Sequence, residues 1–298
     1  MTTETKPKPE VSIIGTGRLG TALALALAEQ GYSIGALVAR RRDKARRAAT
    51  LVAALLDGPS RVLALKELAE QLPSDLLLIS TPDDQIPRVT EALAKLDWDG
   101  SKRIVLHTSG ALSSDVLAPL RKRGWSVGSL HPLVSVSEPR AGARLLHGAF
   151  WCVEGDTRAV RLARSLVRDL DGKSFSISSE NKPLYHAAAV MVSGNVTALF
   201  DVALEMLGQC GLNPKQAQDA LLPLLASAVK NLETLDPAAA LTGTFARGDV
   251  ETVKRHLHVL ERNKAALEIY RVLGLRSLDL AASRLDPAVV KQIRRLIG

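Results

Sequence analysis

The hexapeptide GTGRLG at residues 15–20 constrains the fold of this chain more than any other segment. It follows a predicted strand at residues 11–14 and opens a predicted helix at residues 19–30. In such a turn the first glycine permits the tight bend, the second lets backbone approach a pyrophosphate, and the third lets the helix pack on the strand. The motif therefore predicts a dinucleotide-binding domain, with a merely tight turn as the alternative. The residues expected to contact the dinucleotide are Gly15, Thr16, Gly17, Arg18, Leu19 and Gly20.

Short apolar runs alternate with helical periods up to about residue 177, which is typical of βαβ units in a parallel sheet. The predicted strands are residues 11–14, 33–38, 61–63, 75–80, 103–107, 126–131, 149–154 and 173–177. The helices between them include residues 19–30, 43–56 and 157–170, and Asp156 is placed to cap the last one. Beyond Ser178 only helices are predicted, at residues 180–208, 214–232, 249–260, 264–273 and 287–297.

A length of 298 residues favours two domains. Residues 1–10 are polar and rich in Lys and Pro, so we expect a mobile tail there. Residues 11–178 form the predicted dinucleotide-binding Rossmann domain, and residues 179–298 form a helical domain for substrate binding and dimerisation. The predicted fold class is α/β, a Rossmann-type doubly wound parallel sheet followed by an all-α C-terminal domain.

The end of the second predicted strand discriminates between cofactors. An NAD site usually places Asp or Glu about 20 residues beyond the glycines to hold the ribose hydroxyls. This chain has Arg40, Arg41 and Arg42 there. Cations near the start of a helix face the unfavourable end of its dipole, and a 2′-phosphate would remove that conflict. The sequence therefore favours NADP (NADPH), bound by Arg40 and Arg41, and a solvated charge run is the alternative.

Polar residues follow three further strands, where open α/β sheets bind their ligands. Ser109 is a candidate substrate or proton-relay group, and His131 is a candidate proton donor or substrate contact. Ordinary helix caps and a hydrogen-bonded structural histidine are the alternatives. The predicted cofactor contacts at these strand ends are Ser80, Thr81, Pro82 and Thr108.

Lys182 and His186 are four residues apart at the start of the first helix after the predicted boundary, so they project from one helical face. A cleft beside a dinucleotide domain should open at this place. We therefore expect Lys182 to act as acid/base or carbonyl polariser and His186 as a substrate or relay group. A solvated lysine in the first helical turn is the alternative.

Composition and motifs exclude several classes of protein. The net charge of +8 suits an anionic ligand, while 3% aromatic residues disfavour single-strand nucleic-acid binding. The apolar stretch at residues 187–200 is too short to span a bilayer. His256 and His258 point different ways on a helix, so no metal site is expected. Two cysteines and no apolar signal segment favour a cytoplasmic protein.

The combined motifs resemble a bacterial family of Rossmann-like proteins with a C-terminal helical domain of unknown function, whose members are named as NADP oxidoreductases. The resemblance covers nearly the whole chain. It implies a fold similar to relatives of 6-phosphogluconate dehydrogenase, including pyrroline-5-carboxylate reductase, prephenate dehydrogenase and β-hydroxyacid dehydrogenases, and brings no established substrate. The motifs are GTGRLG at 15–20, STPDD at 80–84, HTSGAL at 107–112, SLHPL at 129–133, KPLYHAAAV at 182–190 and FARGD at 245–249.

Within that wider group, the substrate-contacting histidine-proline pair of prephenate dehydrogenases looks like His131 and Pro132. The catalytic lysine of β-hydroxyacid dehydrogenases, and the asparagine four residues later, look like Lys182 and His186. Histidine replaces asparagine, so that mechanism does not transfer unchanged. The resembling dehydrogenases commonly dimerise through this helical region.

Together these features predict an NADP(H)-dependent oxidoreductase that acts on a small polar, carboxylate-bearing substrate in a cleft between the domains. The predicted assembly is a homodimer through the helical domain, without nucleic-acid or membrane partners. A non-catalytic NADP-binding sensor is the first alternative. A nucleic-acid-binding protein that uses the cluster at residues 40–47 is the second.

Overall fold

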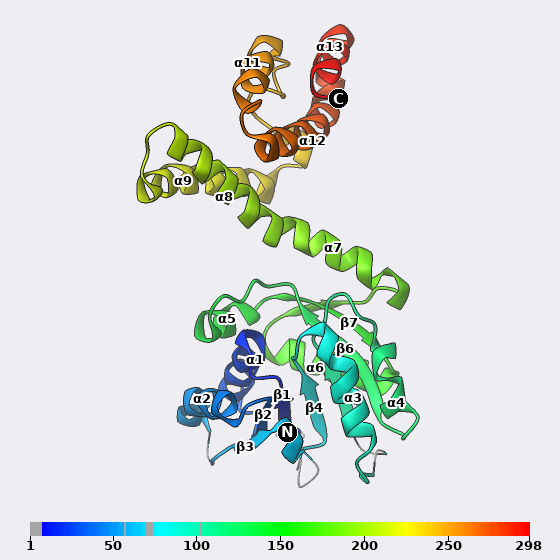
Figure 1. Cartoon of the computed structure of the whole chain (residues 1–298). Coiled ribbons are helices and arrows are strands. Elements are labelled where there is room, and N and C mark those ends of the chain that lie inside the picture. Colours follow the sequence, from blue (N-terminus) through cyan, green and yellow to red (C-terminus); the bar gives the residue numbers. More distant parts are fainter. Residues whose placement is uncertain (1–7, 57, 69–73, 100, 102) are drawn as a thin grey trace, which may run out of the picture. The chain divides into compact units, whose positions relative to one another are not determined.

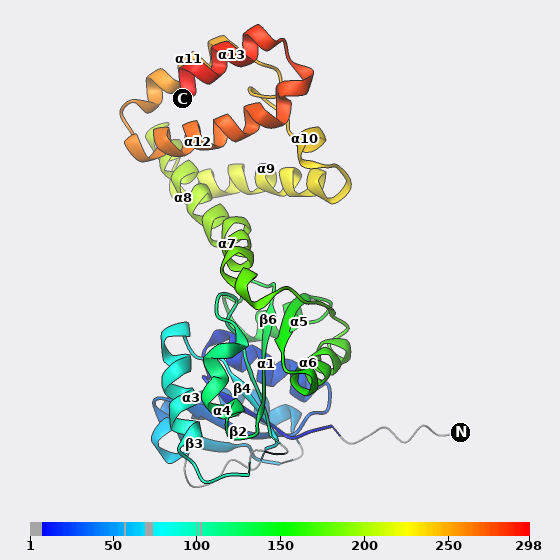
Figure 2. The same ribbon diagram turned by 90° about the vertical axis from the view of Figure 1, so that its right-hand side faces the viewer.

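The computed structural model describes residues 8–56, 58–68, 74–99, 101 and 103–298. The chain divides into two compact units, Met1–Gly194 and Asn195–Gly298. Figures 1 and 2 show a sheet with flanking helices in the first unit and helices in the second. The predicted fold class, an α/β domain followed by an all-α one, is confirmed.

The first unit is built on one eight-stranded sheet with the order β3-β2-β1-β4-β5-β6-β7-β8. All eight predicted strands are present, within about two residues of their predicted bounds. The strands are β1 (Val11–Ile14), β2 (Ile34–Ala39), β3 (Arg61–Ala64), β4 (Leu76–Ile79), β5 (Ile104–His107), β6 (Ser126–Pro132), β7 (Phe150–Gly155) and β8 (Lys173–Phe175).

One pairing departs from the predicted parallel sheet. β7 runs antiparallel to β6, whereas all other neighbours are parallel. The connection between β6 and β7 contains an α-helix that begins at Pro139, directly after a loop. This connection does not carry the chain back to the edge of the sheet at which β6 begins. Parallel strands need such a return crossover, so the next strand enters from the opposite edge.

Helices cover both faces of this sheet, because side chains alternate between its faces. On β1, Ile13 belongs to one core and Ile14 to the other. Ile13 packs with α1, α2, α5 and α6, while Ile14 packs with α3 and α4. The helices are α1 (Arg18–Glu29), α2 (Arg42–Val52), α3 (Ile86–Ala94), α4 (Ala118–Arg121), α5 (Pro139–Leu146), α6 (Thr157–Asp169) and α7 (Lys182–Val192).

The expected mobile tail lies outside the described residues except for residues 8–10. There the tail is anchored: Lys8 donates to the Gln30 carbonyl at 2.6 Å and pairs with Asp169 at 3.3 Å. Glu10 accepts a hydrogen bond from Ser74 at 3.1 Å. The charged side chains of Lys8 and Glu10 thus bond to residues beside α1, α6 and β4, and the mobility of the tail stays a prediction.

Asp156 occupies the N-cap position of α6, as predicted, but its carboxylate does not cap the helix. It accepts instead from the Val127 amide and the Arg121 guanidinium, both at 2.9 Å. These bonds join α6 to β6 and α4. The Asp156 carboxylate therefore bonds to residues far away in the sequence instead of to the amide groups at the start of its own helix.

The second unit is helical throughout its regular structure. A small core forms around Val253, Leu278 and Ile293. Asp249 caps α11, accepting from the Thr252 amide at 3.0 Å. The helices are α8 (Gly194–Gln209), α9 (Pro214–Thr234), α10 (Pro237–Ala240), α11 (Val250–Leu260), α12 (Lys264–Ala281) and α13 (Pro287–Ile297).

The division between the units falls after Gly194, later than the end of the strand pattern at Ser178. Side chains of α7 bond to the sheet loops, so this helix belongs to the first unit. By length and composition alone, Ser179–Gln209 could cross a membrane, with a mean hydropathy of 1.6. The prediction that residues 187–200 are too short to span a bilayer considered only part of the apolar segment, because the apolar pattern continues along α8.

Candidate functional site

The glycine loop lies where the carboxyl ends of β1 and β4 meet, at the point where the strand order reverses. Gly15 has a φ of +106°, and a Cβ there would lie 2.5 Å from the Ser80 backbone. A Cβ on Gly20 would collide with the Gly15 carbonyl. A Cβ on Gly17 would meet nothing within 4 Å. Two glycines therefore allow close packing, and Gly17 leaves open space for a ligand.

A cavity of about 470 Å³ adjoins this loop and is lined by Gly15, Thr16, Gly17, Ser80, Thr81 and Pro82. The hydroxyls of Thr16 and Thr81 are buried there without a hydrogen-bond partner. The N-terminus of α1 also lacks a side-chain cap. Unused hydroxyls and amide N–H groups at a helix N-terminus suit a phosphate-bearing ligand. These residues fit the dinucleotide that the sequence predicts.

Basic side chains line the other end of the same cavity. Arg40, Arg41 and Lys44 contribute to its wall. Arg41 also pairs with Asp43 at 3.2 Å. Arg42 does not line the cavity and lies 3.7 Å from Glu67. The cavity therefore offers two guanidinium groups and one ammonium, and the arginine that was not chosen as a cofactor contact faces elsewhere.

A second hollow of about 460 Å³ shares part of this wall and extends beyond it. Gly17 and residues 80–82 line both spaces. Thr108, Ser109, Gly110, His131 and His186 are among the other lining residues, as are Arg18, Leu19 and Asp83. The structure thus brings nearly all predicted site residues to one edge of the sheet. A ligand that fills the first cavity can extend into the second.

Ser109 is the most heavily bonded residue of this edge. Its hydroxyl donates to Asp83 at 2.8 Å and accepts from the amides of Ala111 and Leu112 at 3.2 and 3.0 Å. Its amide donates to His107 at 3.2 Å. The hydroxyl proton is directed at Asp83, so this arrangement holds the loop and Asp83 in place. Ser109 does not offer a free proton to a substrate.

Lys182 is fully buried, with 0% of its surface exposed. Its ammonium donates to the Ser129 hydroxyl at 2.8 Å and to the Ser109 carbonyl at 3.1 Å. Burial lowers the Lys182 pKa, while the charges of Cys152, Glu154 and Asp83 oppose this shift. The pKa is therefore lowered in the direction expected of a catalytic lysine. The ammonium lies behind Ser109, however, and does not line the second hollow.

His131 lines the hollow and is held by α7. Its Nδ1 lies 2.7 Å from the Tyr185 hydroxyl, and its ring meets the His186 ring edge-on at 5.6 Å between centroids. Burial lowers the His131 pKa to about 3, and the positive charge of Lys182 adds to the shift. His131 is therefore neutral at physiological pH. Tyr185 can donate to Nδ1, which leaves the proton of the ring on Nε2.

The rings of His131 and His186 lie against Gly110, which is part of the loop after β5. A Cβ at this position would collide with Nδ1 of His186 and lie 2.7 Å from Nε2 of His131. Nδ1 of His186 is buried without a hydrogen-bond partner. Both rings therefore present nitrogen atoms towards the Gly110 backbone, and any larger residue would separate them from it.

His107 is a different kind of histidine. It is fully buried, its Nε2 lies 3.2 Å from the Ser113 carbonyl, and its Nδ1 accepts from the Ser109 amide. Both ring nitrogens are thus used. Burial lowers its pKa to about 3. It is a neutral structural residue that fixes the loop.

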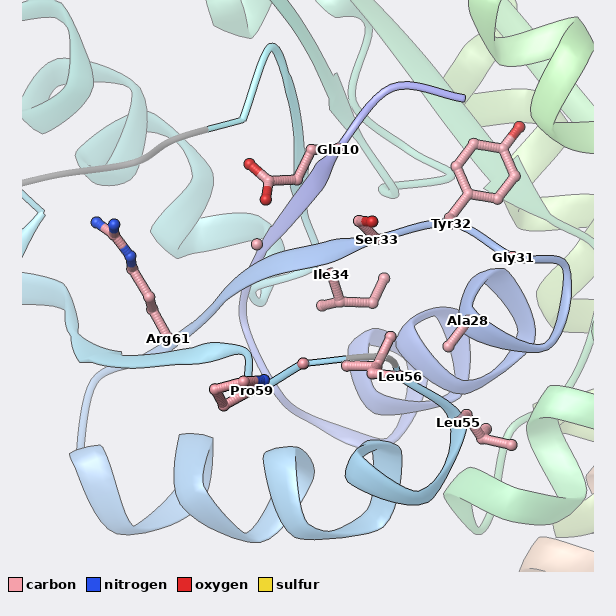
Figure 3. A pocket seen from close by; sticks show the side chains of 12 residues that line it. Glu10, Ala28, Gly31, Tyr32, Ser33, Ile34, Leu55, Leu56, Pro59 and Arg61 are labelled. Atoms are coloured by element: carbon pink, nitrogen blue, oxygen red, sulfur yellow. The ribbon is translucent and has the colours of Figure 1, made fainter. Parts of the chain in front are cut away.

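A further hollow, of about 290 Å³, lies at the amino ends of the strands and away from the glycine loop. Figure 3 shows Glu10, Tyr32 and Arg61 around it, together with side chains of the turn after α1. Tyr32 donates to Asp169 and Glu10 accepts from Ser74, so both groups are already bonded. This hollow shares no residue with the two cavities at the glycine loop.

Arg247, which lies in the motif FARGD at 245–249, is exposed in the second unit. Its amide donates to the Gly243 carbonyl at 3.2 Å. Gly248 has a φ of +65° and packs on Val289. The loop is therefore a tight turn that leads into α11, and its geometry within the second unit assigns no ligand to Arg247.

Sequence reasoning missed three residues of the site. Asp83 was part of a quoted motif but was treated as a helix-cap type, and its position directly after a strand end was the available signal. Tyr185 lies in the motif at 182–190, and the sequence assigned it no role. Lys44 was not separated from the other basic residues, because its direction depends on how α2 starts.

Comparison with known families agrees with this architecture. Residues 2–132 match a Rossmann-like domain, and residues 149–277 match the family described as a domain of unknown function, DUF2520. The chain thus combines a Rossmann-like domain with a DUF2520 domain, which confirms the resemblance stated from the motifs. None of the functionally curated proteins matches the chain.

Solved structures of the same fold cover nearly the whole chain. The putative NADP oxidoreductase BF3122 of Bacteroides fragilis is 22% identical with a TM-score of 0.75, covering 91% of this chain and 98% of its own. Protein TM1727 of Thermotoga maritima is 24% identical with a TM-score of 0.70, covering 92% and 99%. Pyrroline carboxylate reductase of Plasmodium falciparum, solved with NADP bound, is 12% identical with a TM-score of 0.55, covering 97% and 98%.

The open space beside Gly17 gives a test of the cofactor cavity. We expect Gly17→Val to abolish NADPH binding, because the side chain would occupy the space left for the pyrophosphate. The fold should persist, since no atom obstructs a Cβ there. Fluorescence titration with NADPH and thermal melting would measure both effects. Gly20→Val is the contrasting variant and should destabilise the unit itself. Unchanged NADPH affinity in folded Gly17→Val would contradict the assignment.

The neutral histidines predict acid sensitivity of stability. The folded pKa of His131, about 3, lies below the 6.5 of an ordinary histidine, so between these values the unfolded chain binds more protons. Stability should therefore fall as the pH drops below 6.5. Melting temperatures from pH 7.5 to 4.5 should decline less steeply in His131→Gln than in the wild type. The exposed His258→Gln variant is the control and should follow the wild type. Equal slopes in all three proteins would contradict the burial of a neutral His131.

Proposed function

We propose that the protein is an NADP(H)-dependent oxidoreductase acting on a small polar substrate. The observation that supports this most is the pair of cavities that share a wall at the glycine loop, with unpartnered threonine hydroxyls in one and paired histidines in the other. The fold is shared with a protein that holds NADP. Titration with NADPH, followed by NADPH oxidation against keto acids, imines and hydroxy acids, tests the proposal.

The cofactor would be held by residues that already line the first cavity. Thr16, Thr81 and the amides at the start of α1 would bind the phosphates, and Arg40 and Arg41 would hold the 2′-phosphate. Bound NADPH would supply a hydride to the substrate. Arg18 lines the second hollow as its one cationic side chain among the described residues, where it can bind a carboxylate of the substrate or a phosphate of the cofactor.

His131 is the best-placed group for proton transfer. Its Nε2 faces Gly110 at the wall of the hollow, and the bond to Tyr185 sets its tautomer. A neutral imidazole can donate a hydrogen bond to a developing negative charge, and Tyr185 can pass a proton to it. Lys182 then acts as a positioning residue that fixes Ser109 and Ser129, in place of the direct acid/base role expected from the sequence.

A non-catalytic NADP-binding sensor remains the second candidate. The features that favour it are the complete use of the Ser109 hydroxyl and the burial of Lys182, since neither residue offers a free proton. NADPH binding without turnover of any compound in the panel would support the sensor.

The cofactor assignment predicts a selective loss. Arg40→Ala combined with Arg41→Ala should weaken NADPH binding by at least about tenfold, because a charge-assisted hydrogen bond contributes roughly 1.5 to 3 kcal/mol. NADH, which lacks the 2′-phosphate, should bind as before. Isothermal titration with both cofactors measures this difference. Arg46→Ala is a matched control, since Arg46 is exposed on α2 and does not line the cavity. Equal losses for both cofactors would defeat the assignment.

The role of Lys182 can be separated from general damage. Lys182→Met should reduce turnover by about 10² to 10⁴, as expected when a proton-transfer site is disturbed, with NADPH affinity within about twofold of wild type. It should also raise the pKa of His131 from about 3, because a nearby positive charge is removed. An NMR titration of the histidine rings checks the pKa. A turnover within threefold of wild type would leave Lys182 without a role in the reaction.

We also propose a homodimer through the helical region. Leu184 and Val192 on α7 are 74% and 77% exposed in the single chain, and α9 exposes further apolar side chains. A helix that is apolar on most sides is usually buried in a bundle or an interface. The longer segment Ser179–Gln209, which includes α7 and α8, passes the length and composition test for a membrane span, but Asp201 and Glu205 lie on α8. A subunit interface therefore explains it better.

Light scattering at micromolar concentration should give twice the chain mass of 31.9 kDa. Val192→Glu should shift the protein towards the monomer, because a charge would be buried in the interface. Glu91→Lys, an exposed charge reversal on α3 in the first unit, serves as the control for the assay. A wild-type monomer would contradict the dimer.

A further inference from the structure

We infer that the substrate carries a protonated nitrogen at its reacting carbon, an iminium or amine, which Asp83 holds in the second hollow. This inference rests on the proposed oxidoreductase function and names its substrate class. It begins from one residue that the sequence did not single out and that the proposed proton transfer does not use.

Asp83 follows the end of β4 and lines the second hollow. It is the one carboxylate among the residues that line it. Its Oδ2 accepts the Ser109 hydroxyl at 2.8 Å, and that hydroxyl is itself oriented by the amides of Ala111 and Leu112. The side chain is therefore held in a fixed direction by a loop whose own bonds are satisfied. Such orientation is what a binding group needs.

No Lys or Arg among the described residues forms an ion pair with Asp83. The nearest buried cation, Lys182, bonds to Ser109 and Ser129 instead. Its ammonium senses the charge of Asp83 through space, but the Ser109 backbone lies between the hollow and Lys182. Asp83 therefore presents a net negative charge to whatever enters the hollow.

The other side chains that line the hollow do not neutralise the negative charge of Asp83 at the place where the substrate would react. His131 is neutral, and His186 has an unpartnered Nδ1. Arg18 is the only other charged lining residue, and it stands at the start of α1 beside the glycine loop. A ligand with a cationic nitrogen and a carboxylate could thus meet Asp83 and Arg18 together.

Charge distinguishes the two common substrates of hydride transfer. When a ketone accepts hydride, its oxygen gains negative charge, which a neighbouring carboxylate opposes. When a protonated imine accepts hydride at carbon, the C=N electron pair moves to nitrogen, which becomes a neutral amine and then takes a proton from solvent. The nitrogen is cationic in the protonated imine and again in the amine once it has taken up its proton, so Asp83 attracts both the substrate and the protonated product.

The experiment uses the full chain with saturating NADP and two probes of the same carbon skeleton, cyclopentylamine and cyclopentanol. At pH 7.5 the amine is protonated and the alcohol is neutral. Calorimetric titration should show the amine binding at least about tenfold more tightly, the effect of one charge-assisted hydrogen bond. Repeating the titrations without NADP shows whether the amine site exists independently of the cofactor.

Asp83→Asn is the decisive variant, because an amide oxygen can still accept the Ser109 hydroxyl while the charge is removed. It should lower amine affinity by about tenfold and leave cyclopentanol and NADPH binding within twofold. Asp84→Asn is the matched control, since Asp84 bonds to Gln85 and does not line the hollow. It should bind the amine as the wild type does.

The outcomes separate this inference from the proposed function. If NADPH binds but the wild type does not prefer the amine, or Asp83→Asn retains amine affinity within twofold, the inference is wrong and the cofactor assignment stands. If the amine binds through Asp83 but NADPH does not bind, the proposed oxidoreductase fails while the amine site remains. Loss of amine affinity in Asp84→Asn as large as in Asp83→Asn would reduce Asp83 to part of a general acidic surface and overturn the inference.

Discussion

The site depends on a buried lysine ammonium that bonds to neutral oxygen atoms. Lys182 begins α7, yet its side chain reaches the Ser109 carbonyl and the Ser129 hydroxyl. A charge inside a protein is costly unless its hydrogen bonds are satisfied, so the loop after β5 must keep its carbonyl at that position. Ser109 then fixes Asp83 through its hydroxyl. One buried cation thus ties together α7, two strand ends and the carboxylate that faces the second hollow.

The same cation contributes to the low pKa values of His131 and His107. Burial is the larger cause of the low His131 pKa, and the Lys182 charge adds to it. A neutral imidazole beside Tyr185 can donate a hydrogen bond through its Nε2–H group to a developing negative charge, and it stays neutral over a wide pH range. His107, with both nitrogens used by the backbone, shows the other outcome of burial: the same shift without any access to a ligand. His131 and His107 therefore differ in whether a ligand can reach the ring, and not in the pKa alone.

The sequence predicted the sheet well because four-residue runs such as Leu76–Ile79 are apolar at every position and have no other stable place than a covered sheet. It predicted the tight glycine loop after β1 because Gly15 and Gly20 are required locally. It could not predict that Arg42 turns towards Glu67, that Asp156 bonds to β6, or that Lys182 is buried behind Ser109. The positions of these three side chains depend on contacts with residues that are far away in the sequence. The alternative arrangements of each side chain differ by only a few hydrogen bonds. The antiparallel β7 escaped notice for the same reason, since strand direction depends on the length and path of the preceding connection.

Helix α7 joins the chemistry of the site to the proposed assembly. Its first turns supply Lys182 and Tyr185 to hydrogen bonds and His186 to a ring contact with His131 within the first unit, and its last turn exposes Met191 and Val192. The two ends of α7 have different requirements. The polar end needs a fixed position relative to β6, and the apolar end needs other apolar side chains to pack against it. In the proposed homodimer, a second copy that covers the apolar end would restrict the motion of the whole helix, because helical hydrogen bonds transmit position along its length. The spacing between Tyr185 and His131 would then be set by assembly as well as by local packing, which gives the apolar residues of α7 an effect on proton transfer without any contact with the substrate.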